Sequence, residues 1–394
     1  MTRPRKPEGE PAASNFHVVT AVWGEQFCRL FLDVCVPNQL TRGNLEALPA
    51  GSRYRVLTAP EDARVFETSP ALRQVEQVMP VDIVVLPELS ARSKNRFTRM
   101  NACHRRALTD ARETSSAVIF LCADHLLGEG TLAAVVRRHA AGSRAVVCSG
   151  VWVEVEGFLA ALGERATRGV SAREMVAAAI DHLHPSVRAL MVEGERTARS
   201  PHQVYWEVPG EGVLMRCFDL HPLMVDPLHR EVLPQETIDG HYVRHACPVR
   251  EQVHMVSDSD ELLIIEMSRA DQVKVDTSPG GILPWTVSAA LARCDTHQES
   301  YWSQPIRLHA HDLNAAWALI EERSQRFADQ AVRLRRARRW LTLRYMRLRW
   351  RRATKECSGR RLWRAFGLAT HSVSRRVQRL RKRAARTGRR VLAR

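Results

Sequence analysis

The stretch AVIFLCADHLLGEGTL, residues 117–132, shows the fold class most clearly. Its apolar run, residues 117–122, stops just before Asp124. A short continuous apolar run next to polar and glycine residues is typical of a strand that is buried on both faces. Helical spacing follows from 130 to 141, and Gly142 is a suitable C-terminal stop. The stretch therefore predicts a buried strand, a polar turn and a helix.

The same alternation of strand and helix runs through the first 157 residues. Strands are predicted at 16–23, 54–58, 81–89, 117–122 and 144–157, and helices at 25–48, 95–113 and 130–141. Continuous apolar strands that alternate with helices predict an α/β fold, with a mostly parallel sheet flanked by helices. In such sheets ligands bind outside the carboxyl ends of the strands, where Asp124 lies.

The alternation is less regular after residue 157. Residues 171–191 have helical spacing, and residues 202–218 predict two strands around Pro209-Gly210-Glu211-Gly212. Asp258 and Asp260 precede ELLIIEMS, residues 261–268, which we interpret as a helix capped by these acids. The alternative is that the two carboxylates, which would share one side of an extended chain, bind a cation.

Charge divides the chain into two parts. Residues 331–394 contain 24 Lys and Arg against a single acid, Glu356, which gives +23. The whole chain carries +16, so residues 1–330 carry −7. A mildly acidic body with a strongly basic tail is therefore expected.

Other features of composition limit the location. The sequence has no apolar run of the length that crosses a bilayer, which is about 18 residues. Residues 1–14 are charged and proline-rich, and we interpret them as a disordered leader, not a signal peptide. Nine scattered cysteines fit free thiols in a reducing compartment. A cytoplasmic protein is expected, peripheral at the inner membrane if the tail binds lipid.

Several motifs of residues 15–270 occur together in one known family. They are the strand opening at Phe16–Trp23, TAPEDA after the second strand, and MNACHRRAL leading into AVIFLCADHLLGEGTL. The later ETIDGHYV and VSDSDELLIIEMS are similar to acceptor-side segments of bacterial glycosyltransferase-like proteins. The chain thus resembles a GT-A-type nucleotide-sugar glycosyltransferase. The resemblance implies a GT-A-like (Rossmann-like) sheet, divided into a nucleotide-binding half, 15–157, and an acceptor half, 158–320.

The resemblance also implies roles for individual residues. Asp124 would hold a divalent cation, Mn or Mg, and the donor diphosphate, and Asp239 would be the base that takes the acceptor proton. Four further residues would line the nucleotide-sugar site: Thr20, Trp23, Asp62 and Arg99. From the residues alone, Asp124 and Asp239 could instead simply occupy turns, without a chemical role.

One position departs from the family pattern. The pattern is usually Asp-x-Asp, and here Cys122 stands at the first position. A metal-independent transferase, or a catalytically inactive GT-A-like binding or scaffold protein, is therefore the alternative. His309 and His311 form an H-x-H pair, in which His309 would complete the metal shell. Zinc hydrolysis is disfavoured because neither a Glu-x-x-His nor a Cys pair accompanies them.

The basic tail, which we place at 321–394 as a helical extension, has three candidate partners. Arg with interleaved Trp suits an anionic membrane surface, nucleic acid, or docking on an acidic protein. Taken together, the resemblance implies a glycosyltransferase that moves a sugar from a nucleotide diphosphate to a glycan or lipid-linked acceptor in envelope polysaccharide synthesis. A nucleic-acid-binding protein that acts through its tail is the other alternative.

Overall fold

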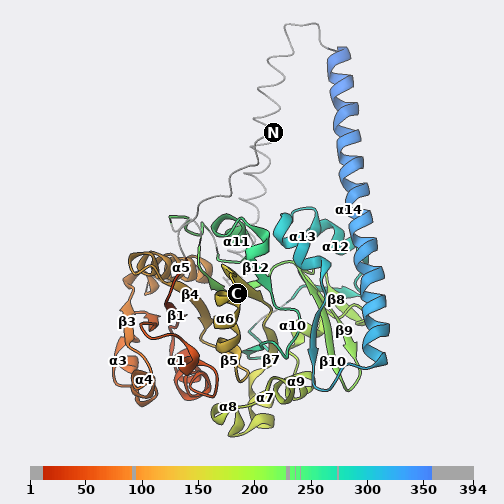
Figure 1. Ribbon diagram of the computed structural model, residues 1–394. Coiled ribbons are helices and arrows are strands. Elements are labelled where there is room, and N and C mark those ends of the chain that lie inside the picture. The colour runs from red at the N-terminus through yellow and green to blue at the C-terminus, as the bar shows by residue number, and fades with distance from the viewer. Residues whose placement is uncertain are drawn as a thin grey trace. The chain divides into compact units, whose positions relative to one another are not determined.

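The structure is a computed structural model, which describes residues 12–90, 95–227, 231–235, 237–239, 241–272 and 275–356. The chain divides into two compact units, Met1–Val332 and Arg333–Arg394. The first unit is a mixed α/β body built on a seven-stranded, mostly parallel sheet (Figure 1). The predicted leader and the far tail lie almost wholly outside the described residues.

The central sheet confirms the predicted parallel core. Its order is β12 (Val253–Met255), β6 (Ala145–Cys148), β11 (His221–Val225), β4 (Ala117–Cys122), β1 (Phe16–Ala21), β2 (Arg53–Thr58) and β3 (Val81–Val85). Strand β11 runs antiparallel to both β4 and β6, whereas the other neighbours pair in parallel. The strands β1 and β4 are almost completely buried, as continuous apolar runs require.

Helices flank this sheet and connect its strands (Figure 1). In chain order the first are α1 (Glu25–Leu30), α2 (Val36–Gln39), α3 (Ala63–Glu67), α4 (Pro70–Glu76), α5 (Arg96–Glu113) and α6 (Thr131–Ala140). A π-helical segment, Phe31–Cys35, joins α1 to α2 directly before Pro37. The helical spacing of residues 25–48 includes Pro37, which predicts a break or kink there. Helix α2 ends at Gln39, two residues after this proline.

Three smaller sheets complete the body. They are β5 (His125–Leu127), β13 (Ile264–Ser268) and β7 (Val151–Glu154); β15 (Ile306–His309), β10 (Gly212–Cys217) and β9 (Gln203–Val208); and β14 (Thr277–Pro279) with β8 (Arg196–Ala198). The remaining helices are α7 (Val155–Leu162), α8 (Arg165–Arg168), α9 (Ala172–Asp181), α10 (Pro185–Arg188), α11 (His241–Ala246), α12 (Pro284–Leu291), α13 (Thr296–Ser303) and α14 (Ala315–Glu356). The two strands predicted within 202–218 are β9 and β10, which pair antiparallel.

Two predictions of local structure were wrong. The segment 261–268 contains strand β13, because its backbone pairs with β5 on one side and with β7 on the other instead of closing helical hydrogen bonds. The single strand predicted at 144–157 is two strands, β6 and β7, which belong to different sheets. Ser149-Gly150 separates them, and this break carries the chain from the central sheet to the small one.

A second apolar cluster joins helix α14 to the body. It includes Trp206, Trp302, Trp317 and Phe327, all at most 9% exposed. Buried Arg216 donates from Nε to Ser324 Oγ at 2.6 Å, and α14 runs continuously through the boundary predicted at residues 320 and 321. The first turns of the predicted tail thus pack as part of the body.

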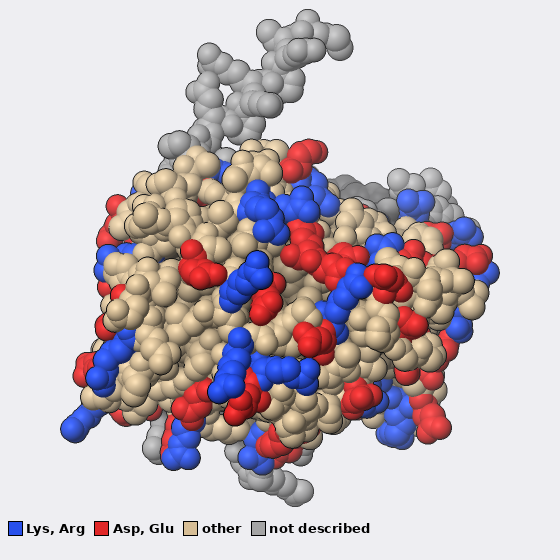
Figure 2. All heavy atoms as spheres, turned by 60° about the horizontal axis from the view of Figure 1, so that its bottom comes forward, with Lys and Arg blue, Asp and Glu red and all other residues tan. Residues whose placement is uncertain are grey.

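The described surface mixes both signs of charge. On the face shown in Figure 2, Lys and Arg alternate with Asp and Glu without a large area of one sign. The apolar stripe predicted at Val373, Val377, Leu380 and Ala384 lies outside the described residues. Of the helices that the structure describes, none combines the length and apolar content needed to cross a membrane.

Candidate active site

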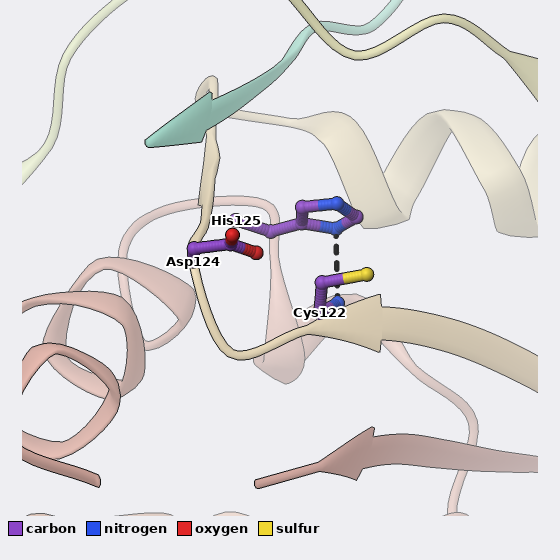
Figure 3. Close-up of side chains that lie close together, drawn as sticks. All are labelled: Cys122, Asp124 and His125. Atoms are coloured by element: carbon purple, nitrogen blue, oxygen red, sulfur yellow. Dashed lines mark hydrogen bonds between the residues drawn. The ribbon is translucent and has the colours of Figure 1, made fainter. Parts of the chain in front are cut away.

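Asp124 lies in a tight turn between β4 and β5, at the carboxyl edge of the central sheet (Figure 3). Two contacts fix this turn from outside. The Asn38 side chain accepts from Leu127 N–H at 2.7 Å and donates to Leu127 O at 3.1 Å. It thus makes the pair of hydrogen bonds that the backbone of a neighbouring strand would make. The backbone N–H of Met267, on β13, donates to Asp124 O at 3.0 Å. The turn is therefore held on a rigid frame.

The residues on either side of Asp124 are packed, and Figure 3 shows how they lie. The N–H of Cys122 donates to Nδ1 of His125 at 3.1 Å, and the His125 ring meets the edge of His221 at a centroid distance of 5.5 Å. Burial holds the pKa of His125 well below its usual range and that of the Cys122 thiol well above. Near neutral pH, His125 is therefore an uncharged structural group and Cys122 a thiol.

A cavity of about 450 Å³ opens beside this turn. Its lining comes from strands β4, β7, β9, β11 and β13, from residues next to β6, β9 and β10, and from the segment before α11: Cys122, Ser149, Gly150, Trp152, His202, Gln203, Asp219, His221, Thr237, Asp239 and Glu266. The volume falls in the range of small-molecule sites. The structure thus brings Cys122 and Asp239, which are far apart in the sequence, to one cavity.

His221 and Asp239 form the charged pair of the cavity. His221 Nε2 donates to Phe120 O at 2.9 Å, and its Nδ1 lies 3.7 Å from Asp239 Oδ1. Burial acts to lower the pKa of His221, but its pairing with Asp239 outweighs burial and raises it. Burial likewise acts to raise the pKa of Asp239, and the pairing with His221 lowers it. Asp239 is therefore a carboxylate near neutral pH, and its side chain is 49% exposed.

Two further carboxyls lie in the same low-dielectric region. Burial raises the pKa of Asp124 to about 6. Burial, and next the charge of Asp124, raise the pKa of Glu266 to about 7. Shifts of this kind are common where acids serve chemistry, and here they occur beside a cavity.

The residues predicted for the nucleotide end lie around the ends of β1 and β2. Asp62 Oδ2 accepts from Gly24 N–H at 2.7 Å, which fixes the chain after β1. The Arg99 guanidinium lies over the Trp23 ring at 5.2 Å and donates to Leu89 O at 3.1 Å. Thr20 is fully buried within the central sheet. Trp23, Asp62 and Arg99 are partly exposed, and Thr20 faces the core.

Asp258, Asp260 and His309 form a separate cluster, and none of them lines the cavity. His309 Nε2 lies 2.9 Å from Asp258 Oδ1 and 3.8 Å from Asp260 Oδ2. Arg173 on α9 donates to Asp260 at 2.8 Å. The two aspartates lie close together in a turn, not in the extended chain that their spacing argument assumed, and they pair there with basic side chains. His311 contributes only its carbonyl, which accepts from His309 Nδ1 at 2.7 Å.

The donor types beside the cavity decide which cation would fit. Ligand atoms of Cys122, Asp124 and His125 lie within 4.8 Å of one another. However, Cys122 keeps its proton, and His125 Nδ1 already accepts a hydrogen bond. Only Asp124 of the three offers the oxygen that Mg²⁺ and Mn²⁺ prefer. A hard cation at this turn would therefore have Asp124 as its oxygen ligand and would need further oxygens from elsewhere, as when phosphates complete a Mg²⁺ site.

Sequence reasoning missed His221 and Glu266. Glu266 carried a signal: it is a lone acid inside the apolar run LLIIEMS, which a buried strand tolerates only where the acid has a use. His221 follows the turn after β10, and nothing in its local sequence distinguishes it. Only the return of β11 between β4 and β6 places it beside Asp239.

Comparison with known proteins adds little to this picture. No family model matches the chain, and no curated protein matches it. Among solved structures, the crystal structure of S. aureus TarS is similar at a TM-score of 0.25 and 13% identity. That match covers 36% of this chain and 23% of the TarS chain. A likeness this slight does not bear on the function.

Proposed function

We propose that this chain is a GT-A-like glycosyltransferase that uses a nucleotide-diphosphate sugar. One observation carries the proposal: Asp239, from the segment before α11, and Glu266, from β13, line one cavity at the carboxyl edge of the parallel sheet, and Asp124 lies in the turn beside it. The charge of Asp124 contributes to the raised pKa of Glu266. This is the edge at which α/β proteins bind their ligands.

Asp239 would act as the base toward the acceptor hydroxyl. A base must be unprotonated and within reach of its substrate. His221 keeps the Asp239 carboxylate ionised, and half of its side chain is exposed, which would leave it open to an acceptor. His221 would orient this carboxylate, because Phe120 O fixes the ring through Nε2.

Asp124 would position the diphosphate of the donor. Its carboxylate would hold a divalent cation, which, when bound, neutralises charge that develops on the leaving diphosphate. Trp23 and Arg99 would border the nucleotide end, where Arg99 offers N–H donors suited to phosphate. The acceptor would be a glycan or a lipid-linked glycan, which approaches from the side of Asp239.

A donor screen tests this function. Purified protein would be screened by thermal shift against nucleotide sugars, with and without Mn²⁺, and then assayed for donor hydrolysis and transfer. We expect at least one donor to raise the melting temperature and to be turned over. Asp124→Asn and Asp239→Asn should each abolish turnover, whereas Glu207→Gln, an exposed acid on β9, should not.

The outcomes separate the proposal from its rivals. Binding without turnover in the unaltered protein would identify a binding module. Cys122, which stands at the first acid position of the family pattern, is the sequence feature that favours this alternative. If no nucleotide sugar binds under any condition, the proposal fails.

A further inference from the structure

Asp219 is a carboxylate of the cavity that the proposed mechanism does not use. It lies in the turn between β10 and β11, shortly before His221. Gln298 on α13 donates from Nε2 to Asp219 Oδ1 at 2.5 Å. The Gln298 amide is itself held, because its Oε1 accepts from the N–H of Asp295 at 2.9 Å. The start of α13 therefore fixes one oxygen of Asp219 and sets the direction of the carboxylate.

The second oxygen of Asp219 is open to a ligand. Among the described residues, none donates a hydrogen bond to Oδ2, and Asp219 is exposed where it lines the cavity. Burial raises the pKa of Asp219, because the protein offsets its negative charge only in part. A ligand that donates hydrogen bonds to Oδ2, or that carries a positive charge, would supply the rest.

The charges of the cavity indicate which kind of ligand suits Asp219. Three carboxyl side chains line it, Asp219, Asp239 and Glu266, and none of its described lining residues is Lys or Arg. His221 is paired with Asp239, and burial lowers the pKa of His202, which is therefore uncharged near neutral pH. A phosphate or carboxylate would meet like charge here, whereas a cationic group would be attracted.

The acids of the cavity are arranged for a ligand larger than a metal ion. In the part of the chain that the structure describes, no three carboxyl or imidazole side chains of this cavity bring ligand atoms within 4.8 Å of one another. Acids that stand apart suit a molecule whose donors point in several directions. Ser149, Gln203 and Thr237 add neutral hydroxyl and amide groups to the lining, and such groups pair with the hydroxyls of a sugar.

We propose that Asp219 is the specificity residue of the acceptor site and binds the ammonium group of an amino sugar. The inference rests on the proposed function, because the ligand of the cavity would be the acceptor. The ammonium would donate to Asp219 Oδ2, and a hydroxyl of the same acceptor would face Asp239. An ammonium offers three donors and no acceptor, which matches a carboxylate in a cavity lined by other acids. Acetylation of the amine removes its charge, so Asp219 would favour the free amino sugar over the acetylated one.

Binding of simple sugars to the full chain tests this assignment without any transfer assay. Glucosamine and galactosamine would be compared with glucose, galactose and N-acetylglucosamine by saturation-transfer NMR titrations at about pH 7. At least one amino sugar should bind about tenfold or more tightly than its neutral counterparts, as expected for a hydrogen bond between two charged groups.

Variants of Asp219 show whether its charge causes the preference. Asp219→Asn removes the charge but keeps an oxygen that can accept from Gln298 Nε2, and it should reduce the preference to less than about threefold. Asp219→Glu, which restores the charge, should bind the amino sugar more tightly than Asp219→Asn does. Glu207→Gln, an exposed acid on β9 outside this cavity, should keep the full preference. Thermal unfolding of each variant would check the fold.

The inference is wrong if the unaltered protein prefers neither amino sugar, or if Asp219→Asn keeps the preference of the unaltered protein. It is also wrong if Asp219→Glu binds no better than Asp219→Asn. These results remain distinct from a failure of the proposed function. A protein that prefers amino sugars through Asp219 yet transfers no sugar would retain this specificity and lose the transferase proposal. A transferase that shows no preference for free amines would lose the inference alone.

Discussion

His221 and Asp239 face each other across the candidate site, with Nδ1 3.7 Å from Oδ1, although neither was expected to have the other as a partner. The pair ties β11 to the segment before α11. It also sets the ionisation of both groups, since each favours the charged form of the other. The consequences can be measured.

The first prediction concerns the pH dependence of transfer. The pKa of Asp239 lies below its usual value, so this base stays ionised down to pH values below the ordinary range of aspartate. We expect kcat to hold over that range at saturating donor and Mn²⁺, where a cation on Asp124 would keep that carboxylate ionised as well. His221→Gln removes the cation that lowers this pKa, so the acidic limb of the profile should move to higher pH. Asp239→Asn should lower kcat by about 10²- to 10⁴-fold. An acidic limb that does not move in His221→Gln would contradict the role given to this pair.

The second prediction concerns stability against pH. The pKa of Glu266 is raised from 4.5 to about 7 in the folded protein, so the folded state binds more protons than the unfolded state between these values. Stability should therefore fall as pH rises from about 4.5 to 7, and stay lower above that. Glu266→Gln removes this loss and should be more stable than the unaltered protein by roughly 3 kcal/mol at about pH 8, in metal-free buffer. Urea unfolding at about pH 5 and pH 8 measures the difference, which should shrink to below about 1 kcal/mol at the lower pH.

A third prediction follows from Arg216, a buried cation that anchors α14. Its guanidinium donates to Ser324 Oγ, Gln325 Oε1 and the carbonyls of Trp302 and Ser303, and burial lowers its pKa to about 10. Arg216→Lys cannot reproduce this fork of donors and should destabilise the body by about 1–3 kcal/mol. Arg326→Lys, at an exposed ion pair of the same helix, should change stability by less than about 0.5 kcal/mol. Equal effects of the two substitutions in thermal unfolding would show that Arg216 is no anchor.

The fourth prediction concerns Asn38, which holds the Asp124 turn through Leu127. Asn38→Asp keeps the acceptor for Leu127 N–H but loses the donor to Leu127 O, and it buries a charge. We expect it to lower the free energy of unfolding by about 2–3 kcal/mol. Gln74→Ala, exposed on α4, should stay within about 0.5 kcal/mol of the unaltered protein. Denaturant titrations that show no difference between the two would contradict the role of Asn38.

The local pattern of apolar residues predicted a strand correctly where the whole strand is buried. Strands β1 and β4 lie inside the sheet and are buried on both faces, which accounts for their continuous apolar runs. Strand β3 lies at the edge and is only partly buried, yet it and β2 were predicted too. The pattern misled at 261–268, because a short apolar run fits a buried helix as well as a buried strand. Only the neighbours β5 and β7 decide between them.

The sequence by itself determined the α/β class, the parallel core and the position of Asp124 at its carboxyl edge, because strand burial and strand ends are written in local residue order. It also determined the contrast between an acidic body and a basic tail, which is a matter of counting. The tertiary structure decided which distant groups share the cavity. His221 lies on β11, an antiparallel strand between β4 and β6. Glu266 lies on β13, which pairs with β7, the strand that follows Gly150. Such meetings depend on long-range pairing of strands, and no local pattern records that pairing.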